Sequence, residues 1–320
     1  FPGSTLRSYG NTSNVVVTKW ANGVAPINLP ASGSPGWGNL TINVASLGGS
    51  WNQSGTLTNV QGNLNITATG GGTNEFRLTG NTATTLTIGG NLNISGGGFV
   101  GNTGSASPTI TIAGDMNITG GYFLPCNNSG TTCTVNVTGN GVLNGGHIVG
   151  AGSSRTNVFT MSNLTVTGNS VFGLSQSSSS ALILTTGSIT ISGTATMYSS
   201  SSGNITINCT GNFSSTSTGG AALVVVPVVL PGAALQAYCF ALAVSSSAGK
   251  TYNLNLGGNF SVTGTGAFGG GSASSAANIN FTGGAATVTY TAAPSVMSVT
   301  NPNKKNNFVV ASGKTLTLNN

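Results

Sequence analysis

Apolar and small polar residues alternate in short runs along most of the chain. Leu64-Asn65-Ile66, Leu92-Asn93-Ile94 and Ile110-Thr111-Ile112 are three of these runs. A period of two is typical of a β-strand that buries one of its faces. Turns rich in glycine separate the runs. The pattern therefore predicts an all-β protein built from many short strands.

The runs return at a nearly constant interval. Gly90 and Gly114 open two similar segments, GNLNISGGG and GDMNITGGY, that start 24 residues apart. Further copies open at Gly62, Gly139, Gly187, Gly211 and Gly258. Hairpins also give short strands and glycine turns, but they do not explain this period, whereas a coil of three strands per turn does. We therefore predict a right-handed parallel β-helix (β-solenoid) with rungs of about 24 residues.

The copies also set the expected domain organisation. Residues 51–320 are predicted to form the repeat array, with about ten to twelve rungs and a length of roughly 50 Å. Residues 1–50 repeat poorly and are predicted to form an N-terminal cap or junction. Gly211 and Gly258 are 47 residues apart, nearly two periods, which implies a further copy inside 212–257. The alternation reaches the last residues without an evident cap, which predicts that the rod continues or docks end to end on another chain.

Stacked rungs would align equivalent residues in columns along the rod. Small polar side chains in an outward column would hydrogen-bond along it, without the repulsion that aligned charges suffer. The predicted outward polar ladder consists of Asn65, Asn93, Asn117, Thr165, Thr190, Ser214 and Ser261. We expect the Gly-Asn pairs to form one corner through positive φ angles, and Gly-Gly pairs such as Gly96-Gly97 and Gly120-Gly121 to form a second.

The scarcity of charge narrows the function. Only 3% of the residues are charged, and the eight cations that give the net charge of +6 are scattered along the chain. A nucleic-acid-binding protein would gather its cations on one face, so we expect no nucleic-acid partner.

Candidate catalytic residues are few. Asp115 and Glu75 are the only acids, whereas sugar-cleaving β-helices need clustered carboxylates. Asp115 replaces a corner Asn and is interpreted as a turn residue, and Glu75 is expected to pair loosely with Arg77. His147 is the single histidine and has no acidic partner in its repeat, so it is interpreted as a rung-surface or corner residue. We predict no enzymatic activity, no metal and no cofactor.

Pairs of the form Thr-x-Thr, such as Thr85/Thr87 and Thr109/Thr111, raise the hypothesis of ice binding, because flat threonine arrays order water. In the sequence these pairs do not persist at one position across rungs. Threonine on a strand face also has an ordinary explanation in β-propensity. The ice-binding hypothesis is therefore set aside at this point.

Four cysteines are candidates for disulfide bonds: Cys126, Cys133, Cys209 and Cys239. Cys126 and Cys133 flank a short polar loop that a disulfide would close, contributing on the order of 2–3 kcal/mol. No histidine or second cysteine lies at zinc-ligand spacing. Disulfides persist in oxidising compartments, so we expect an extracellular protein. Because no signal peptide precedes Phe1, we interpret the chain as the mature or excised portion of an exported protein.

Residues 221–244 form a long apolar stretch with three interpretations. It is an apolar rung or loop packed on the solenoid, a hydrophobic lateral contact surface, or a membrane span. Pro227 and Pro231 would break a membrane-spanning helix and argue against the third. The contact surface would consist of Val224, Val225, Val226, Val228, Val229 and Leu230.

In GNLNITATGGG, GNLNISGGGFVGN and GDMNITGGYFLPCNNSGTTCTVNVTGN the sequence resembles repetitive surface proteins of Bacteroidota, which are exported by the type IX secretion system and include gliding-type adhesins. The resemblance covers residues 39–320. It implies a β-solenoid stalk or adhesin that is exposed on the outer membrane or released. Members end in a C-terminal sorting domain, and its absence here favours a fragment of a longer protein.

Three functional hypotheses follow. The leading one is a non-catalytic structural or adhesive stalk or filament component of a bacterial cell surface, whose partners are other protein chains or extracellular glycans. The second is a carbohydrate-binding or carbohydrate-active β-helix. The third is an extracellular fibre subunit that assembles end to end.

Overall fold

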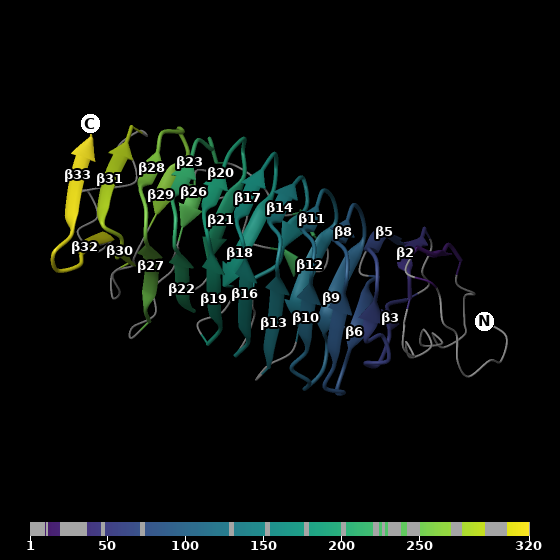
Figure 1. Cartoon of the computed structure of the whole chain (residues 1–320). Helices are drawn as coiled ribbons and strands as arrows, with labels where there is room; N and C mark the ends of the chain where they lie inside the picture. Colours follow the sequence, from purple (N-terminus) through teal and green to yellow (C-terminus); the bar gives the residue numbers. More distant parts are fainter. Residues whose placement is uncertain are drawn as a thin grey trace.

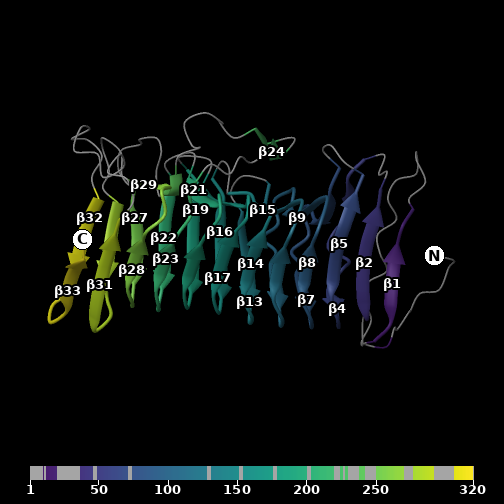
Figure 2. The same cartoon turned by 90° about the horizontal axis from the view of Figure 1, so that it is seen from above.

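The chain winds as a rod of stacked strands, from β1 at one end to β33 at the other (Figure 1, Figure 2). The computed structural model describes residues 10, 12–19, 37–45, 49–70, 74–127, 131–150, 154–175, 179–199, 203–219, 224–225, 228–229, 238–241, 250–269, 277–291 and 306–319. Within these residues the secondary structure is entirely β.

Three sheets form the walls of the rod in the described part of the chain. Sheet A contains β1 (Asn14–Val17), β2 (Asn39–Val44), β5 (Leu64–Thr69), β8 (Leu92–Ile94), β11 (Met116–Ile118), β14 (Gly141–Asn144), β17 (Leu164–Thr167), β20 (Ile189–Ile191), β23 (Phe213–Ser215), β28 (Phe260–Val262), β31 (Ala285–Tyr290) and β33 (Thr315–Asn319). Sheet B contains β4 (Asn59–Val60), β7 (Thr85–Ile88), β10 (Thr109–Ile112), β13 (Thr132–Val137), β16 (Thr156–Met161), β19 (Ala181–Thr186), β22 (Asn204–Cys209), β27 (Tyr252–Leu256), β30 (Ala277–Phe281) and β32 (Asn306–Val310). Sheet C contains β3 (Trp51–Asn52), β6 (Phe76–Thr79), β9 (Gly98–Asn102), β12 (Tyr122–Cys126), β15 (His147–Ile148), β18 (Val171–Ser175), β21 (Thr196–Ser199), β26 (Tyr238–Ala241) and β29 (Ala267–Gly269).

From β4 to β31 the chain passes in each turn from sheet B to sheet A and then to sheet C, as β10, β11 and β12 do. Neighbouring strands of a sheet come from successive turns and run parallel. Thr109 pairs with Thr85 on one side and with Thr134 on the other, which are 24 and 25 residues away. The predicted β-solenoid, with three strands per rung and about 24 residues per rung, is confirmed.

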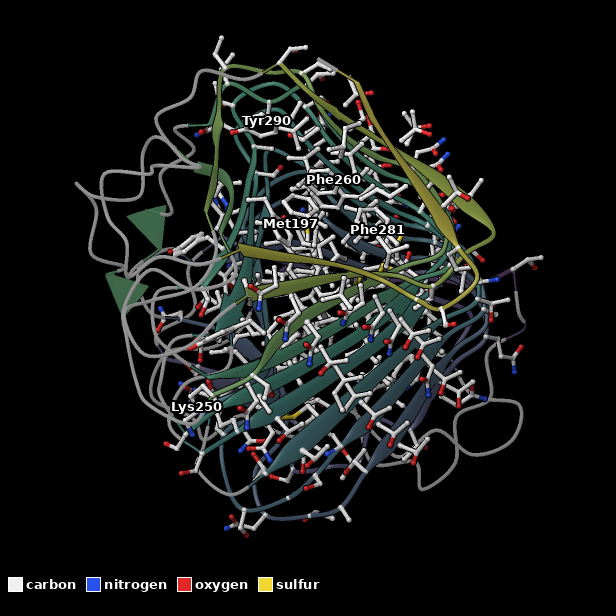
Figure 3. The ribbon with its side chains drawn as sticks, turned by 90° about the vertical axis from the view of Figure 1, so that its left-hand side faces the viewer. Met197, Lys250, Phe260, Phe281 and Tyr290 are labelled. Atoms are coloured by element: carbon white, nitrogen blue, oxygen red, sulfur yellow. A yellow bond between two sulfur atoms is a disulfide. The ribbon has the colours of Figure 1, made fainter. Side chains whose placement is uncertain are left out.

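The inward side chains stack into continuous columns that fill the rod. Leu64, Leu92 and Met116 pair in register and are fully buried, as the alternation predicted. Inside sheet C, the rings of Trp51, Phe76, Phe99 and Phe123 follow one another at centroid distances of 5.4, 5.9 and 5.2 Å. Aromatic side chains bury large apolar areas, so these stacks hold successive rungs together. Figure 3, a view along the rod, shows the labelled Met197, Phe260 and Phe281 inside the ring of sheets.

One rung departs from this inward column. Gly141 lies in register between Met116 and Leu164, so this rung has no side chain at that position. Met161 of sheet B fills the space, because a Cβ on Gly141 would lie 2.5 Å from the Met161 sulfur. The flexible side chain of Met161 therefore occupies the space in the core that Gly141 leaves empty.

The corner between sheets B and A is formed differently from the prediction. None of the Gly-Asn pairs at this corner has a positive φ angle. Instead, each corner side chain reaches over the next rung: Asn63 Oδ1 accepts a hydrogen bond from the Asn91 N–H at 2.7 Å, and Asn91 Oδ1 accepts one from the Asp115 N–H at 2.8 Å. A Cβ on Gly90 would approach Asn63 Oδ1 to less than 3.0 Å. Glycine is therefore needed for close approach, and the predicted positive φ was wrong.

The corner between sheets A and C lies at the Gly-Gly pairs, as predicted, and it is this corner that uses positive φ. Gly97, Gly121 and Gly145 have φ angles of 72°, 62° and 98°. Left-handed backbone of this kind is readily adopted by glycine alone, so the two corners select the same residue for different reasons.

Residues 212–257 do not contain the extra rung that the glycine spacing implied. β23 pairs directly with β28, and β22 pairs directly with β27. The additional residues are an insertion between β23 and β26, and it carries the antiparallel pair β24 (Val224–Val225) and β25 (Val228–Val229), with β24 outside the three sheets (Figure 2). The prediction was wrong because a doubled spacing between glycines does not distinguish a skipped repeat from a long insertion in one rung.

The predicted cap region, residues 1–50, already contains solenoid strands. β1 pairs with β2, and β2 pairs with β5, so both belong to sheet A. Trp37 is buried and bridges to Val60 of sheet B. The described part of this region therefore follows the rung pattern.

Replacing a corner glycine tests this packing. A Cβ on Gly114 would lie 2.9 Å from the Gly90 carbonyl carbon and would also collide with Asn91 Oδ1. We expect Gly114→Ala to lower the free energy of unfolding by about 1–3 kcal/mol, because the corner is overpacked. Chemical denaturation followed by circular dichroism measures this. Gly284→Ala is the matched control, since nothing lies within 4 Å of its Cβ. Equal effects of the two substitutions would refute the explanation.

Candidate functional site

The outward faces of sheets A and B are the candidate functional surfaces. Their strands carry small uncharged side chains and contain no charged residue in the described part of the chain. The outward face of sheet C differs, because β9 and β12 are buried at every position. Only two sides of the rod therefore present strand faces to solvent.

The predicted outward ladder on sheet A is hydrogen-bonded over its first rungs. Asn65 Nδ2 donates to Thr41 Oγ1 at 3.0 Å, Asn93 Nδ2 donates to Asn65 Oδ1 at 2.8 Å, and Asn117 Nδ2 donates to Asn93 Oδ1 at 3.0 Å. These amides therefore use their hydrogen-bonding capacity on one another.

The rest of the ladder is aligned as predicted but is not continuous. Thr165, Thr190, Ser214 and Ser261 occupy the same column in register. Val142 lies in this column after Asn117 and before Thr165. The sequence pattern had not assigned a residue to this rung.

On sheet B, the Thr-x-Thr pairs of two neighbouring rungs are in register, but the next rung has Thr134 and Asn136, so the pairs do not persist, as the sequence indicated. Thr85 is in register with Thr109, and Thr109 with Thr134. A parallel column contains Thr87, Thr111, Asn136, Thr160 and Thr185. Single threonines nevertheless recur in both columns, which spacing counted along the chain does not reveal because the loops between sheets C and B vary in length.

Two asparagine ladders extend the far end of sheet B, and the sequence analysis missed them. Asn255 Nδ2 donates to Asn208 Oδ1, and Asn280 Nδ2 donates to Asn255 Oδ1, both at 2.7 Å. Asn278 and Asn307 bond in the same way along a second column, at 3.0 Å. The recurrent Asn-x-Asn pairs were the signal that could have identified these ladders.

The two acids both have structural partners. Asp115 Oδ1 accepts a hydrogen bond from the Asn140 N–H at 2.7 Å, which confirms its interpretation as a corner residue. Glu75 is not loosely paired. Its buried carboxylate binds Arg77 Nε at 2.8 Å, and the Tyr122 hydroxyl donates to its other oxygen at 2.8 Å. Burial, reinforced by the Glu75 charge, raises the pKa of Tyr122 well above its usual value.

His147 lies at the start of β15 and is partly buried. Its Nδ1 accepts a hydrogen bond from the Val171 N–H at 3.2 Å. Burial lowers the pKa of His147 to about 4, so the imidazole is neutral near pH 7 and acts as an acceptor between two rungs.

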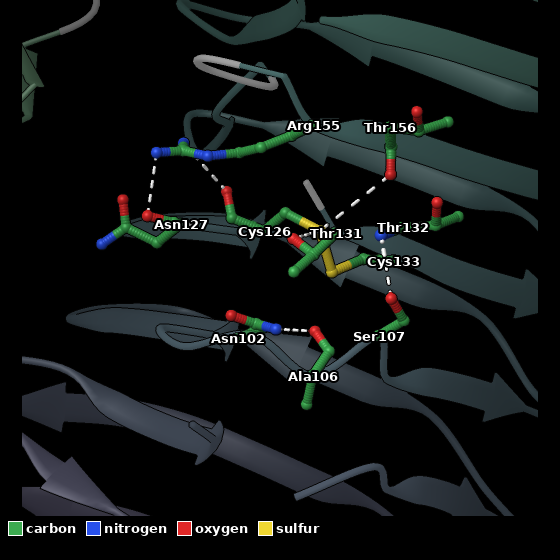
Figure 4. The surroundings of a disulfide bond; sticks show 10 residues. All are labelled: Asn102, Ala106, Ser107, Cys126, Asn127, Thr131, Thr132, Cys133, Arg155 and Thr156. Atoms are coloured by element: carbon green, nitrogen blue, oxygen red, sulfur yellow. Dashed lines mark hydrogen bonds between the residues drawn. A yellow bond between two sulfur atoms is a disulfide. The ribbon is translucent and has the colours of Figure 1, made fainter. Parts of the chain in front are cut away.

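The cysteines divide into one bridge and one free thiol. Cys126 and Cys133 form the predicted disulfide, which closes the loop between β12 and β13 (Figure 4). The candidacy of Cys209 was wrong: its thiol is free, faces the core and contacts the Gly187 carbonyl oxygen at 3.4 Å. Burial raises the pKa of Cys209 to about 11. The side chain of Cys239 lies outside the described residues.

A buried polar cluster surrounds the disulfide, and the sequence analysis missed it. Arg155 donates to the carbonyl oxygens of Cys126 and Asn127 at 3.2 and 2.8 Å, and burial lowers its pKa (Figure 4). Asn157 is in register with Cys133 and fully buried, and neither atom of its amide has a partner among the described residues. An inward asparagine in an otherwise apolar column has no signal in the sequence beyond the broken alternation.

The predicted lateral contact surface is placed only in part. Val224, Val225, Val228 and Val229 form β24 and β25, but their side chains, together with Val226 and Leu230, lie outside the described residues. Where the structure describes the chain, it has no helix suited to crossing a membrane. The described residues also contain no group of three or more His, Cys, Asp or Glu side chains that could hold a metal ion.

Comparisons with known proteins found no match to a protein-family model, a curated protein or a solved structure. Functional inference therefore depends on the faces and side chains described above.

The depressed pKa of His147 predicts a stability change with pH. The unfolded chain takes up a proton near the ordinary pKa of 6.5, before the folded chain does near 4. The free energy of unfolding should therefore fall as the pH drops from 6.5 to 4, by up to about 3 kcal/mol. Denaturation curves across this range measure the fall. His147→Asn keeps a hydrogen-bond acceptor for the Val171 N–H but does not titrate, so the fall in stability that is due to His147 should be absent. The same fall in the variant as in the original chain would refute its assignment to His147.

The unpartnered amide of Asn157 predicts a stabilising substitution. Leu182 occupies the same inward column in the next rung. We expect Asn157→Leu to raise the free energy of unfolding by about 1–3 kcal/mol, because a buried amide without partners is replaced by an apolar group. Asn93→Leu is the control and should destabilise the protein, since it removes two ladder hydrogen bonds. Loss of stability in Asn157→Leu, measured by denaturation, would contradict the prediction.

Proposed function

We propose that this chain is a non-catalytic extracellular β-solenoid that serves as a structural and adhesive rod on a bacterial cell surface. The observation that carries the proposal is the pair of open strand faces on sheets A and B. They align uncharged polar side chains in register along the rod. Such columns offer the same contact repeatedly to an extended partner.

The packing supports a role as a stiff spacer. Each rung pairs with its neighbours, as in other solenoids, so the rod resists bending through its continuous core and its backbone pairing. The hydrogen-bonded ladders at Asn93 and Asn255 add side-chain links between rungs.

The side-chain chemistry supports a binding role over catalysis. The carboxylates of Glu75 and Asp115 are occupied by structural hydrogen bonds, and His147 is an acceptor within sheet C. The disulfide between Cys126 and Cys133 favours an oxidising, extracellular location. The likeness to surface proteins exported by the type IX system favours a bacterial surface, with other protein chains or extracellular glycans as partners.

A second candidate function, end-to-end assembly into a fibre, is favoured by the last rung. Leu318 and Val310 continue the inward columns of Val288 and Phe281. Leu318 is nevertheless 70% exposed, and Val310 is 37% exposed. The edge of β1 that pairs with no described strand would, in a second copy, cover these side chains and extend sheet A.

The shape and binding of the purified chain test both candidates. We expect electron microscopy to show stiff rods roughly 50 Å long per copy. A glycan array and adhesion assays on bacterial cells should detect binding, and a reducing-sugar assay on the same glycans should show no turnover. Globular particles, or rods that bind neither glycans nor cells, would refute the structural and adhesive proposal.

Two sets of variants sharpen these outcomes. If the chain cleaved glycans and Glu75→Gln or Asp115→Asn abolished that activity, the non-catalytic proposal would be refuted in favour of an enzymatic function. Rods of one fixed length at all concentrations would exclude the fibre. Concentration-dependent multiples of that length would support the fibre, provided that Leu318→Lys removes them.

A further inference from the structure

We propose that the outward face of sheet B binds ice. The face comprises two columns of side chains on β7, β10, β13, β16, β19 and β22. The first contains Thr85, Thr109, Thr134, Val158, Ile183 and Thr206, and the second contains Thr87, Thr111, Asn136, Thr160, Thr185 and Asn208. This inference rests on the proposed adhesive function and names the surface to which the rod adheres.

The columns form a regular two-dimensional lattice. Neighbouring strands of a sheet lie about 4.8 Å apart, and alternate residues of a parallel strand lie about 6.6 Å apart. None of the described pairings in sheet B contains a register shift. Sheets A and C each contain at least one. On sheet B, therefore, equivalent side chains of successive rungs are spaced regularly, as a partner with a repeating structure requires.

The side chains of this lattice are suited to holding water in place. Threonine is branched at Cβ, so its hydroxyl and methyl groups have few orientations and are held in fixed positions. The hydroxyls of Thr85, Thr87, Thr109, Thr111 and Thr134 make no side-chain hydrogen bond within the described part of the chain. They are exposed or partly exposed and remain available to water. A preorganised array of this kind binds ordered water with little loss of entropy.

Sheet A has a similar composition, but its first rungs have a different hydrogen-bonding state from the first rungs of sheet B. The amides of Asn65, Asn93 and Asn117 already bond to one another along the column. These groups therefore have less capacity left for a lattice of water. The contrast gives the molecule an internal control face.

Other classes of partner fit sheet B less well. Its strands carry no charge in the described part, and their aromatic residues Phe159, Tyr252, Phe281 and Phe308 are buried or partly buried. Specific protein and small-ligand sites depend on aromatic or charged anchors. The six strands span an area on the order of 400 Å², about half of what each partner buries in a stable protein complex. An extended, uncharged and periodic solid such as ice contacts all of the columns at once.

Adsorption to ice tests the proposal directly. The chain is labelled with a fluorescent dye on its amino groups, since the described lysines Lys19, Lys250 and Lys314 lie outside the strands. It is then exposed to growing polycrystalline ice, and thermal hysteresis is measured on unlabelled protein. We expect the chain to concentrate in the ice and to lower the freezing point below the melting point. Exclusion of the folded chain from ice, as for labelled serum albumin, would overturn the proposal.

Matched variants locate the binding face. Thr111→Tyr raises a bulky ring from the centre of the sheet B lattice and should abolish adsorption and hysteresis. Thr185→Tyr, three strands further along the same column, is a second variant in case the first does not fold. Thr190→Tyr places the same ring on sheet A and should leave ice binding unchanged, with folding checked by circular dichroism. Equal loss in the sheet A and sheet B variants would overturn the assignment to sheet B.

The outcomes also separate this inference from the proposed function. Rods that bind cells or glycans but are excluded from ice would refute ice binding and leave the adhesive rod intact. Glycan binding that is lost in Thr111→Tyr, without any ice adsorption, would assign the face to glycans and overturn the inference.

Discussion

In the three sheets of this solenoid, paired strand residues lie on their equivalents in the rung before and under their equivalents in the rung after, and the rest of the structure depends on this stacking. At a strand separation of about 4.8 Å, identical charges would repel all along the rod. Apolar and amide side chains gain from the same arrangement, as the stacked rings of Phe99 and Phe123 and the bonded amides of Asn65 and Asn93 show. The composition of 3% charged residues is therefore a consequence of the architecture.

The exceptions follow the same logic. Glu75 is buried without a stacked acid, because the next rung has Gly98 in its place. A Cβ on Gly98 would collide with the ring of Tyr122, so the missing side chain leaves room for the Tyr122 ring to extend back to Glu75. At Gly141 the missing side chain is replaced by that of Met161. In both places a change in one rung is compensated by a side chain from another.

The sequence was sufficient to predict the fold class, the period, the outward ladder from Asn65 to Ser261 and the disulfide between Cys126 and Cys133. These features are local: they depend on alternation within a strand, on the return of a motif, or on two cysteines separated by one short loop. The recurrence of single threonines along two columns of sheet B was missed because it depends on pairing between turns. Spacing along the chain grows or shrinks with each loop, whereas pairing does not. The environments of His147 and Asn157 were missed for a related reason, since burial is set by neighbouring rungs.

The insertion between β23 and β26 shows what the pairing controls. Phe213 and Phe260 are in register although 47 residues separate them. The pitch of the rod is therefore independent of the length of chain within a turn. A solenoid of this kind can acquire an insertion at such a junction when one loop becomes longer, while the strands of the rungs on either side keep their register. A longer loop thus widens the rod at one rung, whereas additional repeats lengthen it, and the two changes are independent of each other.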